Sequence, residues 1–259
     1  MTHSKYRAKH HNSLKGFVKS NICRIRNLNK TKYTCPICNY RGPFADFVVP
    51  DTWSVRHARC PNCDSFARHR LAQLAIAELQ KSYNFSAMKM LHFAPEDCFR
   101  QFFPQICQGY ITADLNLEGV DVKANLTQLP FKNAEFDLVF ASHVLEHIRE
   151  DLQALSEIRR VLKPGGIAIL PVPIVGITTV EYPEPNLFEA GHVRAPGLDY
   201  YQRYSDYFCE IKYYSSEDFV EKFQTFVYED RSIYPTKKCP WRQPMTGKKH
   251  IDTIPVCLV

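Results

Sequence analysis

The chain has 259 residues and a formal net charge of +6, with 45% hydrophobic and 13% aromatic residues. This apolar content is enough for a sizeable core and excludes a fully disordered chain. The longest apolar run, residues 165–177, contains Pro171 and Pro173 and is too short to cross a membrane. Because the first 30 residues contain no apolar signal-peptide core, we expect a cytoplasmic protein whose ten cysteines bind metal or stay free rather than form disulfides.

The positive charge is concentrated in residues 1–32, which we name the basic arm. The arm holds nine of the 33 Lys and Arg residues, and the first acidic residue is Asp46, so the remaining residues carry 24 basic against 27 acidic side chains, a formal charge of −3. Apolar residues recur in the arm at near-helical spacing: Leu14, Phe17, Val18, Ile22, Ile25 and Leu28. The pattern fits an amphipathic helix that binds RNA or lies peripherally on an anionic membrane, and equally a helix packed on the body or a solvated tail.

Two Cys-x-x-Cys pairs bound the next segment, residues 33–64. Cys35 and Cys38 form the first pair and Cys60 and Cys63 the second, with 21 residues between the pairs. Each pair can place two sulfurs on one side of a tight turn, and two pairs complete a tetrahedral four-thiolate site. Because such a site has no open position, we predict a structural Zn²⁺ ion in a zinc-ribbon-like module, with free or redox-active thiols as the alternative.

A helix is predicted over residues 65–82, within a linking segment that extends to residue 86. Apolar residues recur there at helical spacing: Ala67, Leu71, Leu74, Ala75 and Leu79. Asp64 or Ser65 is placed to cap the first turn. The cluster Arg68-His69-Arg70 on this helix can bind phosphate or pair with nearby acids.

Strands and helices alternate from residue 87 to residue 259, a pattern typical of an α/β domain with a largely parallel sheet. The predicted strands cover residues 88–93, 109–113, 120–124, 136–141, 167–172, 225–229 and 253–259. The predicted helices cover residues 96–103, 150–162 and 216–223. The sequence Lys163-Pro164-Gly165-Gly166 ends the second of these helices, because proline and glycine stop a helix.

The first two strands of this domain frame a nucleotide-binding pattern. The turn from His92 to Glu96 follows the first strand, and Asp114 ends the second strand, 18 residues after Glu96. In such an arrangement the backbone N–H groups of the turn and a helix N-terminus approach the cofactor, while the acid accepts hydrogen bonds from ribose hydroxyls.

Residues 110–174 resemble the class I S-adenosylmethionine-dependent methyltransferases of the type-11 group. The resemblance is carried, in order, by Asp114, Leu129-Pro130-Phe131, Glu135-Phe136-Asp137, His143-Val144-Leu145-Glu146-His147 and Leu162-Lys163-Pro164-Gly165-Gly166. With the two cysteine pairs and the segments 65–70 and 91–96, residues 33–259 are similar to a bacterial subgroup that carries a zinc-ribbon-like N-terminal module. The resemblance implies a Rossmann-like fold with a mostly parallel seven-stranded sheet and an antiparallel last strand.

The resemblance also implies S-adenosyl-L-methionine as cofactor and the residues that bind it. The cofactor turn consists of His92, Phe93, Ala94, Pro95 and Glu96. Asp114 binds the ribose, and Leu115 lies against the adenine. Asn125, followed by Leu126, stands where the family usually has an acid that contacts the adenine amino group, and its side-chain oxygen can accept the same hydrogen bond.

The methionine end of the cofactor is assigned by the same resemblance to Ser142 and His143, just after the fourth strand. The first turn departs from the family pattern, because it lacks the usual acidic residue and glycines. Pro95 also has no N–H to donate.

Methyl transfer to a hydroxyl benefits from a general base, and histidine is suited to that role near neutral pH. His143 and His192 are the candidates. His192 lies in the long loop after the fifth strand, where class I enzymes usually recognise the acceptor. His147, four residues after His143, can share its helical face. Each of these histidines can also be structural.

The motif series from Asp114 to Gly166 predicts a methyltransferase that acts on a polar small-molecule or glycan acceptor. Only the resemblance to the bacterial subgroup implies the glycan, a sugar hydroxyl of a surface glycan or its precursor. One alternative is an RNA methyltransferase that binds RNA through the zinc module and the basic arm. Another is a non-catalytic binding scaffold with a degenerate cofactor turn. No Asn/Asp-Pro-Pro-aromatic motif follows the fourth strand, which argues against methylation of a base amino group.

Overall fold

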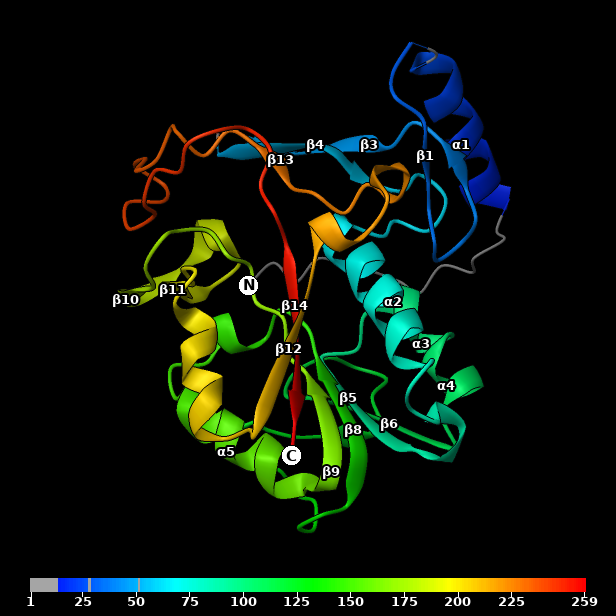
Figure 1. Cartoon of the computed structure of the whole chain (residues 1–259). Coiled ribbons are helices and arrows are strands. Elements are labelled where there is room, and N and C mark those ends of the chain that lie inside the picture. The colour runs from blue at the N-terminus through cyan, green and yellow to red at the C-terminus, as the bar shows by residue number, and fades with distance from the viewer. Residues whose placement is uncertain (1–13, 28, 51) are drawn as a thin grey trace.

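The computed structural model describes residues 14–27, 29–50 and 52–259, so most of the N-terminal half of the basic arm and Leu28 lie outside it. Its centre is a seven-stranded sheet in the order β12-β14-β9-β8-β5-β6-β7 (Figure 1). Neighbouring strands from β9 to β7 are parallel, and β14 is antiparallel to both β9 and β12. The predicted sheet, with its antiparallel last strand, is confirmed. The strands are β5 (Lys89–Phe93), β6 (Gly109–Asp114), β7 (Val122–Lys123), β8 (Phe136–Ala141), β9 (Leu162–Ile169), β12 (Glu210–Ser215) and β14 (Thr253–Leu258).

Helices cover both faces of this sheet, which explains why its central strands are apolar on both sides. Side chains alternate along β5, so Met90 packs with helices on one face and Leu91 packs with helices on the other. The first face is covered by α2 (Ala67–Leu79), α3 (Asp97–Arg100) and α4 (Phe103–Ile106), and the second by α5 (Asp151–Val161) and the 3₁₀ segment η4 (Tyr200–Asp206). The domain is therefore three layers thick.

The prediction was wrong about the segment between η4 and β14. The sixth strand of the central sheet is β12, which no predicted strand covers, and residues 216–223 form two 3₁₀ turns, η5 (Ser216–Asp218) and η6 (Glu221–Phe223), instead of a helix. Edge strand β12 is half exposed and lacks the apolar run that marks a buried strand. The Ser215 hydroxyl accepts from Glu217 N, and Asp218 accepts from Ser215 N, so side chains compete with helical backbone bonds.

Other predicted boundaries shift for local reasons. Residues 96–103 form α3 and the start of a separate helix α4, where Pro104 occupies the first turn, a position that suits proline. The strand predicted from residue 167 begins at Leu162, which pairs with Phe136 before an irregularity in register. Helix α2 begins at Ala67, and its first turn is capped by His69, whose Nδ1 accepts from Phe66 N at 3.1 Å, rather than by Asp64 or Ser65.

The cysteine-bounded segment forms a small sheet that lies above the central sheet in Figure 1. It contains β3 (Ala45–Val49), β4 (Trp53–Arg59) and β13 (Tyr228–Glu229), all antiparallel, beside the short pair β1 (Tyr33–Thr34) and β2 (Arg41–Gly42). The strand predicted at residues 225–229 therefore adds two residues to this sheet and none to the central one. A late segment of the chain is built into the N-terminal module.

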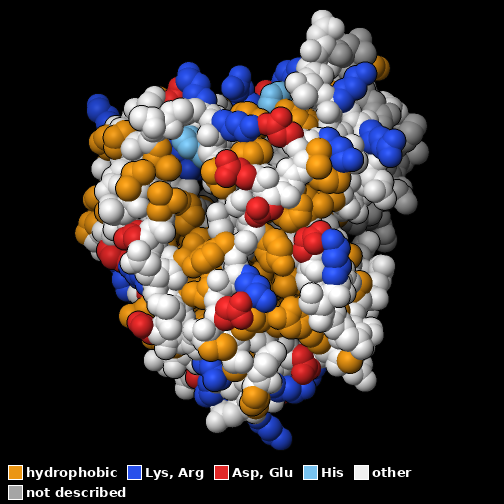
Figure 2. All heavy atoms as spheres, viewed as in Figure 1, with side chains coloured by type: hydrophobic (Ala, Val, Ile, Leu, Met, Phe, Trp, Pro, Cys, Tyr) orange, Lys and Arg blue, Asp and Glu red, His pale blue; other side chains and the backbone are white. Residues whose placement is uncertain are grey.

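The described part of the basic arm contains helix α1 (Leu14–Arg26), which contacts the cysteine module, where Cys23 Sγ donates to Pro43 O at 3.6 Å. Lys19 lies 3.8 Å from Asp64 and Lys30 lies 3.1 Å from Asp46, so module acids pair with two arm cations. The apolar side chains of Val18, Ile22 and Ile25 are exposed. Figure 2 shows Lys and Arg side chains gathered along the upper part of the molecule, over α1 and the small sheet. In the described residues, no helix is both long and apolar enough to cross a bilayer.

The remaining elements follow the carboxyl ends of the central strands or precede β5. They are η1 (Phe85–Ala87), η2 (Leu145–His147), η3 (Leu187–Glu189) and the antiparallel pair β10 (Val180–Asn186) and β11 (His192–Ala195). Segments η2 and β11 are in contact, which brings the loop after β9 onto the loop after β8.

The buried guanidinium of Arg70, on α2, joins the module to the rest of the chain. It donates to the carbonyl oxygens of Ala58 in the module and Ser65 just after it, and to those of Phe223 and Gln224 at the end of η6, at 2.7–3.2 Å. Its Cζ lies 4.4 Å from the centre of the Phe44 ring. Burial lowers the pKa of Arg70 to about 10, so the side chain stays charged at neutral pH.

Replacing Arg70 with Leu should lower the free energy of unfolding by about 3 to 5 kcal/mol, because four buried carbonyls lose their donor. Urea unfolding of the full chain measures this. Arg56, exposed on β4, provides the matched control, and Arg56→Leu should change stability by no more than about 0.5 kcal/mol. Equal effects of the two substitutions would contradict the role given to Arg70.

Candidate functional site

The candidate site lies where β5, β6 and β8 end, because parallel strands bring their carboxyl ends to one edge of the sheet. Ala94 N donates to Ala113 O at 2.8 Å, which joins the turn after β5 to the end of β6. Ala94 and His143, each just past its strand, have left-handed φ angles of 50° and 54°. That conformation is costly for residues other than glycine, and such strain concentrates at functional sites. We name this region the carboxyl-edge site.

Part of the predicted cofactor turn faces the core instead of this edge. The His92 side chain is fully buried, with Nδ1 2.9 Å from the Tyr110 hydroxyl and its ring edge-on to Phe140. Phe93 and Leu126 are also core residues. Burial lowers the pKa of His92 to about 3, so the ring is neutral. The side chains of these three residues pack in the core beneath the carboxyl edge. Only the backbone atoms of these residues can therefore contact a ligand.

Asp114, Leu115 and Asn125 lie on the exposed side of the edge. One oxygen of Asp114, Oδ1, accepts from Asn116 N at 2.7 Å and from Leu117 N at 2.6 Å, which fixes the carboxylate at the end of β6. Leu115 is 55% exposed. The Asn125 side-chain oxygen accepts from Thr127 N at 3.0 Å. Two backbone N–H groups of its own loop thus hold Asp114 in place through Oδ1.

Glu96 closes the turn and is held from helix α2. His69 Nδ1 accepts from Phe66 N, so its other nitrogen carries the proton and donates to Glu96 Oε1 at 2.6 Å. Arg68 lies 3.3 Å from the same oxygen. Burial by itself raises the pKa of Glu96, but His69 and Arg68 together bring it well below its usual range. Glu96 Oε2 is buried and has no hydrogen-bond partner in the protein.

A second group of side chains gathers after β8, around Glu146. This carboxyl is fully buried, and neither of its oxygens has a hydrogen-bond partner in the protein. Oε1 lies 3.5 Å from His143 Nδ1, 3.9 Å from His147 Nε2 and 4.0 Å from His192 Nε2. Burial raises the pKa of Glu146 to about 8 and lowers that of His192 to about 3.

The structure therefore brings His143 and His192, predicted as separate candidates, to one carboxyl group. Sequence reasoning missed Glu146 as a functional residue, although its signal was present in His143-Val144-Leu145-Glu146-His147, where a 3₁₀ turn puts the acid between two histidines. Ser142, predicted to lie beside the methionine moiety, is buried at the end of β8.

Arg194 fixes the backbone of this group. Its buried guanidinium donates to the carbonyls of Leu145 and Ile148, each at 2.6 Å, and to Arg149 O at 3.0 Å. Glu181 holds the opposite side of the same guanidinium at 3.0 and 3.1 Å. Arg194 lies on β11, two residues after His192. Its side chain therefore fixes the position of η2 relative to the strand that carries His192.

The four predicted zinc ligands converge in the cysteine module. Their sulfurs lie within 4.8 Å of one another, with 3.6 Å between Cys35 and Cys63 and 3.6 Å between Cys38 and Cys60. A tetrahedral ion with Zn–S bonds of about 2.3 Å needs sulfurs about 3.8 Å apart. The donor set and its spacing therefore fit Zn²⁺.

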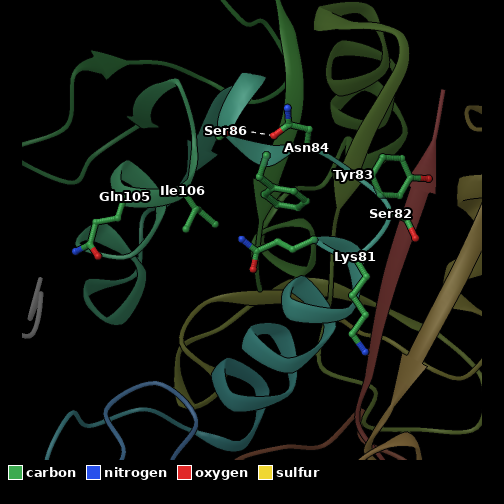
Figure 3. Close-up of a pocket in the computed structure, with 9 residues that line it drawn as sticks. Lys81, Ser82, Tyr83, Asn84, Ser86, Gln105 and Ile106 are labelled. Carbon is green, nitrogen blue, oxygen red and sulfur yellow. Dashed lines mark hydrogen bonds between the residues drawn. The ribbon is translucent and has the colours of Figure 1, made fainter.

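A surface hollow of about 540 Å³ lies elsewhere (Figure 3). It is lined by residues 80–86 together with Gln105 and Ile106. These residues come just before β5 and β6, so the hollow lies at the amino ends of those strands. It is separate from the carboxyl-edge site.

Residues 105–170 match the family model described as a methyltransferase domain. A probable S-adenosylmethionine-dependent methyltransferase of Mycolicibacterium smegmatis is 40% identical over 55 residues, which cover 21% of this chain and 21% of that protein. An uncharacterized protein of Methanocaldococcus jannaschii is 53% identical over 49 residues, 19% of this chain and 21% of that protein. The similar stretches thus span about a fifth of these relatives' own length.

Among solved structures, an S-adenosylmethionine-dependent methyltransferase of Mesorhizobium loti has a TM-score of 0.48 and 10% identity, covering 74% of this chain and 100% of that one. A phosphoethanolamine N-methyltransferase of Haemonchus contortus, in complex with phosphomonomethylethanolamine and S-adenosylhomocysteine, has a TM-score of 0.47 and 16% identity, covering 71% of this chain and 52% of that one. At these scores the likeness says nothing about substrate.

Replacing Ala94 with Gly should raise the free energy of unfolding by up to about 1 kcal/mol, because glycine adopts the left-handed φ of this turn without the cost to alanine. The same substitution at Ala113, buried in β6, should instead lower stability. Thermal and urea unfolding of both variants check the pair. A loss of stability at Ala94 as large as that at Ala113 would contradict the strained turn.

Proposed function

We propose that this protein transfers a methyl group from S-adenosyl-L-methionine to a polar acceptor at the carboxyl-edge site. The observation that carries the proposal is the coincidence of the matched methyltransferase segment, residues 105–170, with β6 and β8, whose carboxyl ends hold Asp114 and His143. In parallel α/β sheets, nucleotide-type ligands bind at this edge.

The residues of the edge fit the charges of the cofactor. Glu96 Oε2 is a buried carboxylate oxygen without a partner, and a cationic donor such as the methionine ammonium group would satisfy it. Asp114 stands at the end of β6, where its carboxylate can accept from ribose hydroxyls. Ala94 takes up the conformation that glycine has in a cofactor turn, which supports a working site over the scaffold alternative.

The acceptor side lies toward η2 and β11, where His143 and His192 remain the predicted general bases. A sugar hydroxyl of a surface glycan or its precursor stays the predicted acceptor. RNA is the less favoured alternative, because Lys19 and Lys30 of the arm already pair with module acids. The bound cofactor supplies the electrophilic methyl group, and the chain orients the acceptor and keeps water out.

We further propose that Cys35, Cys38, Cys60 and Cys63 hold a structural Zn²⁺ ion. The four sulfurs are already gathered, and the positive charge of Arg70 lies beside them, where it would balance a four-thiolate site with a net negative charge. The ion would fix the fold of the cysteine module.

Isothermal titration with S-adenosylmethionine should show binding that Asp114→Ala weakens by roughly 10- to 100-fold, because two charge-assisted hydrogen bonds to the ribose are lost. Glu118→Ala is the control, since Glu118 follows in the same loop, is 92% exposed at its side chain and should leave binding unchanged. Absence of binding to the zinc-loaded wild-type protein would defeat the proposed function.

Metal analysis of the purified protein should find about one tightly held zinc per chain, and a Cys60→Ser variant should lose most of it, because a four-thiolate site needs all four ligands. Cys209→Ser serves as the control, since Cys209 is an exposed thiol outside the cluster. Zinc content that is unchanged in Cys60→Ser would refute this ligand set.

A further inference from the structure

Glu146, His147 and His192 place three metal-binding side chains around one point. One ligand atom from each lies within 4.8 Å of the other two. The rings of His147 and His192 are nearly perpendicular, at 87°, with their centres 4.7 Å apart. Two imidazoles and one carboxylate are a common ligand set for divalent first-row transition metals.

The burial of Glu146 is the observation that demands a ligand. Its side chain has no exposed surface, yet neither oxygen receives a hydrogen bond from the protein. The nearest donors are imidazole nitrogens 3.5–4.0 Å away, too far for hydrogen bonds. A buried carboxyl group without any partner is costly, so its retention points to a cation that the three side chains share.

We propose that Glu146, His147 and His192 bind a divalent transition-metal ion, in a site separate from the four cysteines. Metal–ligand bonds of about 2.1 Å place tetrahedral ligands about 3.4 Å apart, so the ion would draw the imidazole nitrogens toward Glu146 by about half an ångström.

The backbone of this site is fixed without the metal. Arg194 holds the carbonyls of Leu145 and Ile148, which flank Glu146 and His147, and carries His192 on the same strand. Preorganised ligands of this kind need only small side-chain movements to bind an ion. His143, 3.5 Å from Glu146, is the neighbouring group on the side of β8.

Three protein ligands leave coordination positions open. The side chain of His147 is 35% exposed, so the open side can be reached from solvent. This proposal rests on the proposed function in one respect, and it makes His192 a metal ligand in place of the general base proposed above. An acceptor hydroxyl bound there would lose its proton to a solvent base, and its oxygen would form the bond to the methyl carbon as the carbon–sulfur bond breaks and leaves its electron pair on sulfur. The acceptor would then belong to the class of hydroxyl compounds.

Titration of the zinc-containing full-length protein with Co²⁺ tests the site. We expect one further metal per chain and weak visible bands typical of nitrogen and oxygen ligands, without the thiolate charge-transfer band that cobalt in the cysteine site would give. Acetohydroxamate, a small ligand with two oxygens, should shift these bands because coordination positions are open. A spectrum with thiolate character alone, or no Co²⁺ binding, would overturn the proposal.

The variants Glu146→Gln and His192→Ala should each bind Co²⁺ at least about 100-fold more weakly, since each loses a direct ligand. Both should keep their zinc, which shows that they are folded. His57→Ala, a substitution in β4 of the small sheet, is the matched control and should bind Co²⁺ as the wild type does. Unchanged binding in either ligand variant would also overturn the assignment.

Titration of the same proteins with S-adenosylmethionine separates the two proposals. Co²⁺ binding without cofactor binding would leave the metal site standing and remove the methyltransferase. Cofactor binding without Co²⁺ binding would do the reverse.

Discussion

The first turn of α2 is the constraint on which the rest of the structure depends, because three consecutive side chains there tie together parts that are distant in sequence. Arg70 enters the cysteine module and binds backbone carbonyls from both ends of the chain. His69 and Arg68 point the other way, to Glu96 at the carboxyl edge of the central sheet. A buried guanidinium is stable only if its donors are satisfied, so this turn fixes the module relative to the sheet.

Several of the buried polar atoms without a hydrogen-bond partner in the described part of the chain lie at the carboxyl edge, and others lie in or beside the cysteine module, at His57, Arg59 and Gln224. Glu96, His143, Glu146 and His192 each keep a buried oxygen or nitrogen without a protein partner. Natural proteins rarely retain such atoms unless an ordered water, an ion or a ligand meets them. The strained φ angles of Ala94 and His143 lie at the same edge. Backbone strain and buried polar atoms without partners are both typical of ligand-binding sites. Their presence at the same edge is the physical basis of both the cofactor and the metal proposals.

The sequence predicted the central strands well because β5, β8 and the second half of β9 are buried on both faces and must therefore be apolar runs. It failed at β12, whose edge position leaves a half-exposed, mixed strand. It also failed for residues 225–229, since the choice between the central sheet and the small sheet depends on where β4 offers an open edge. Local patterns carry no information about which of two sheets a strand will join.

The sequence by itself determined that the four cysteines form one site, that the central sheet is largely parallel and that an acid ends β6. It could do so because ligand spacing, apolar periodicity and strand order are local properties. Only the tertiary structure decided that His92 supports the turn from the core, and that Arg70 is a structural clamp and no phosphate site. It also joined His192 to Glu146 across 46 positions of the chain. The reason is physical: whether a polar side chain meets water, a carbonyl or another ionisable group depends on burial, and burial is set by the packing of distant segments.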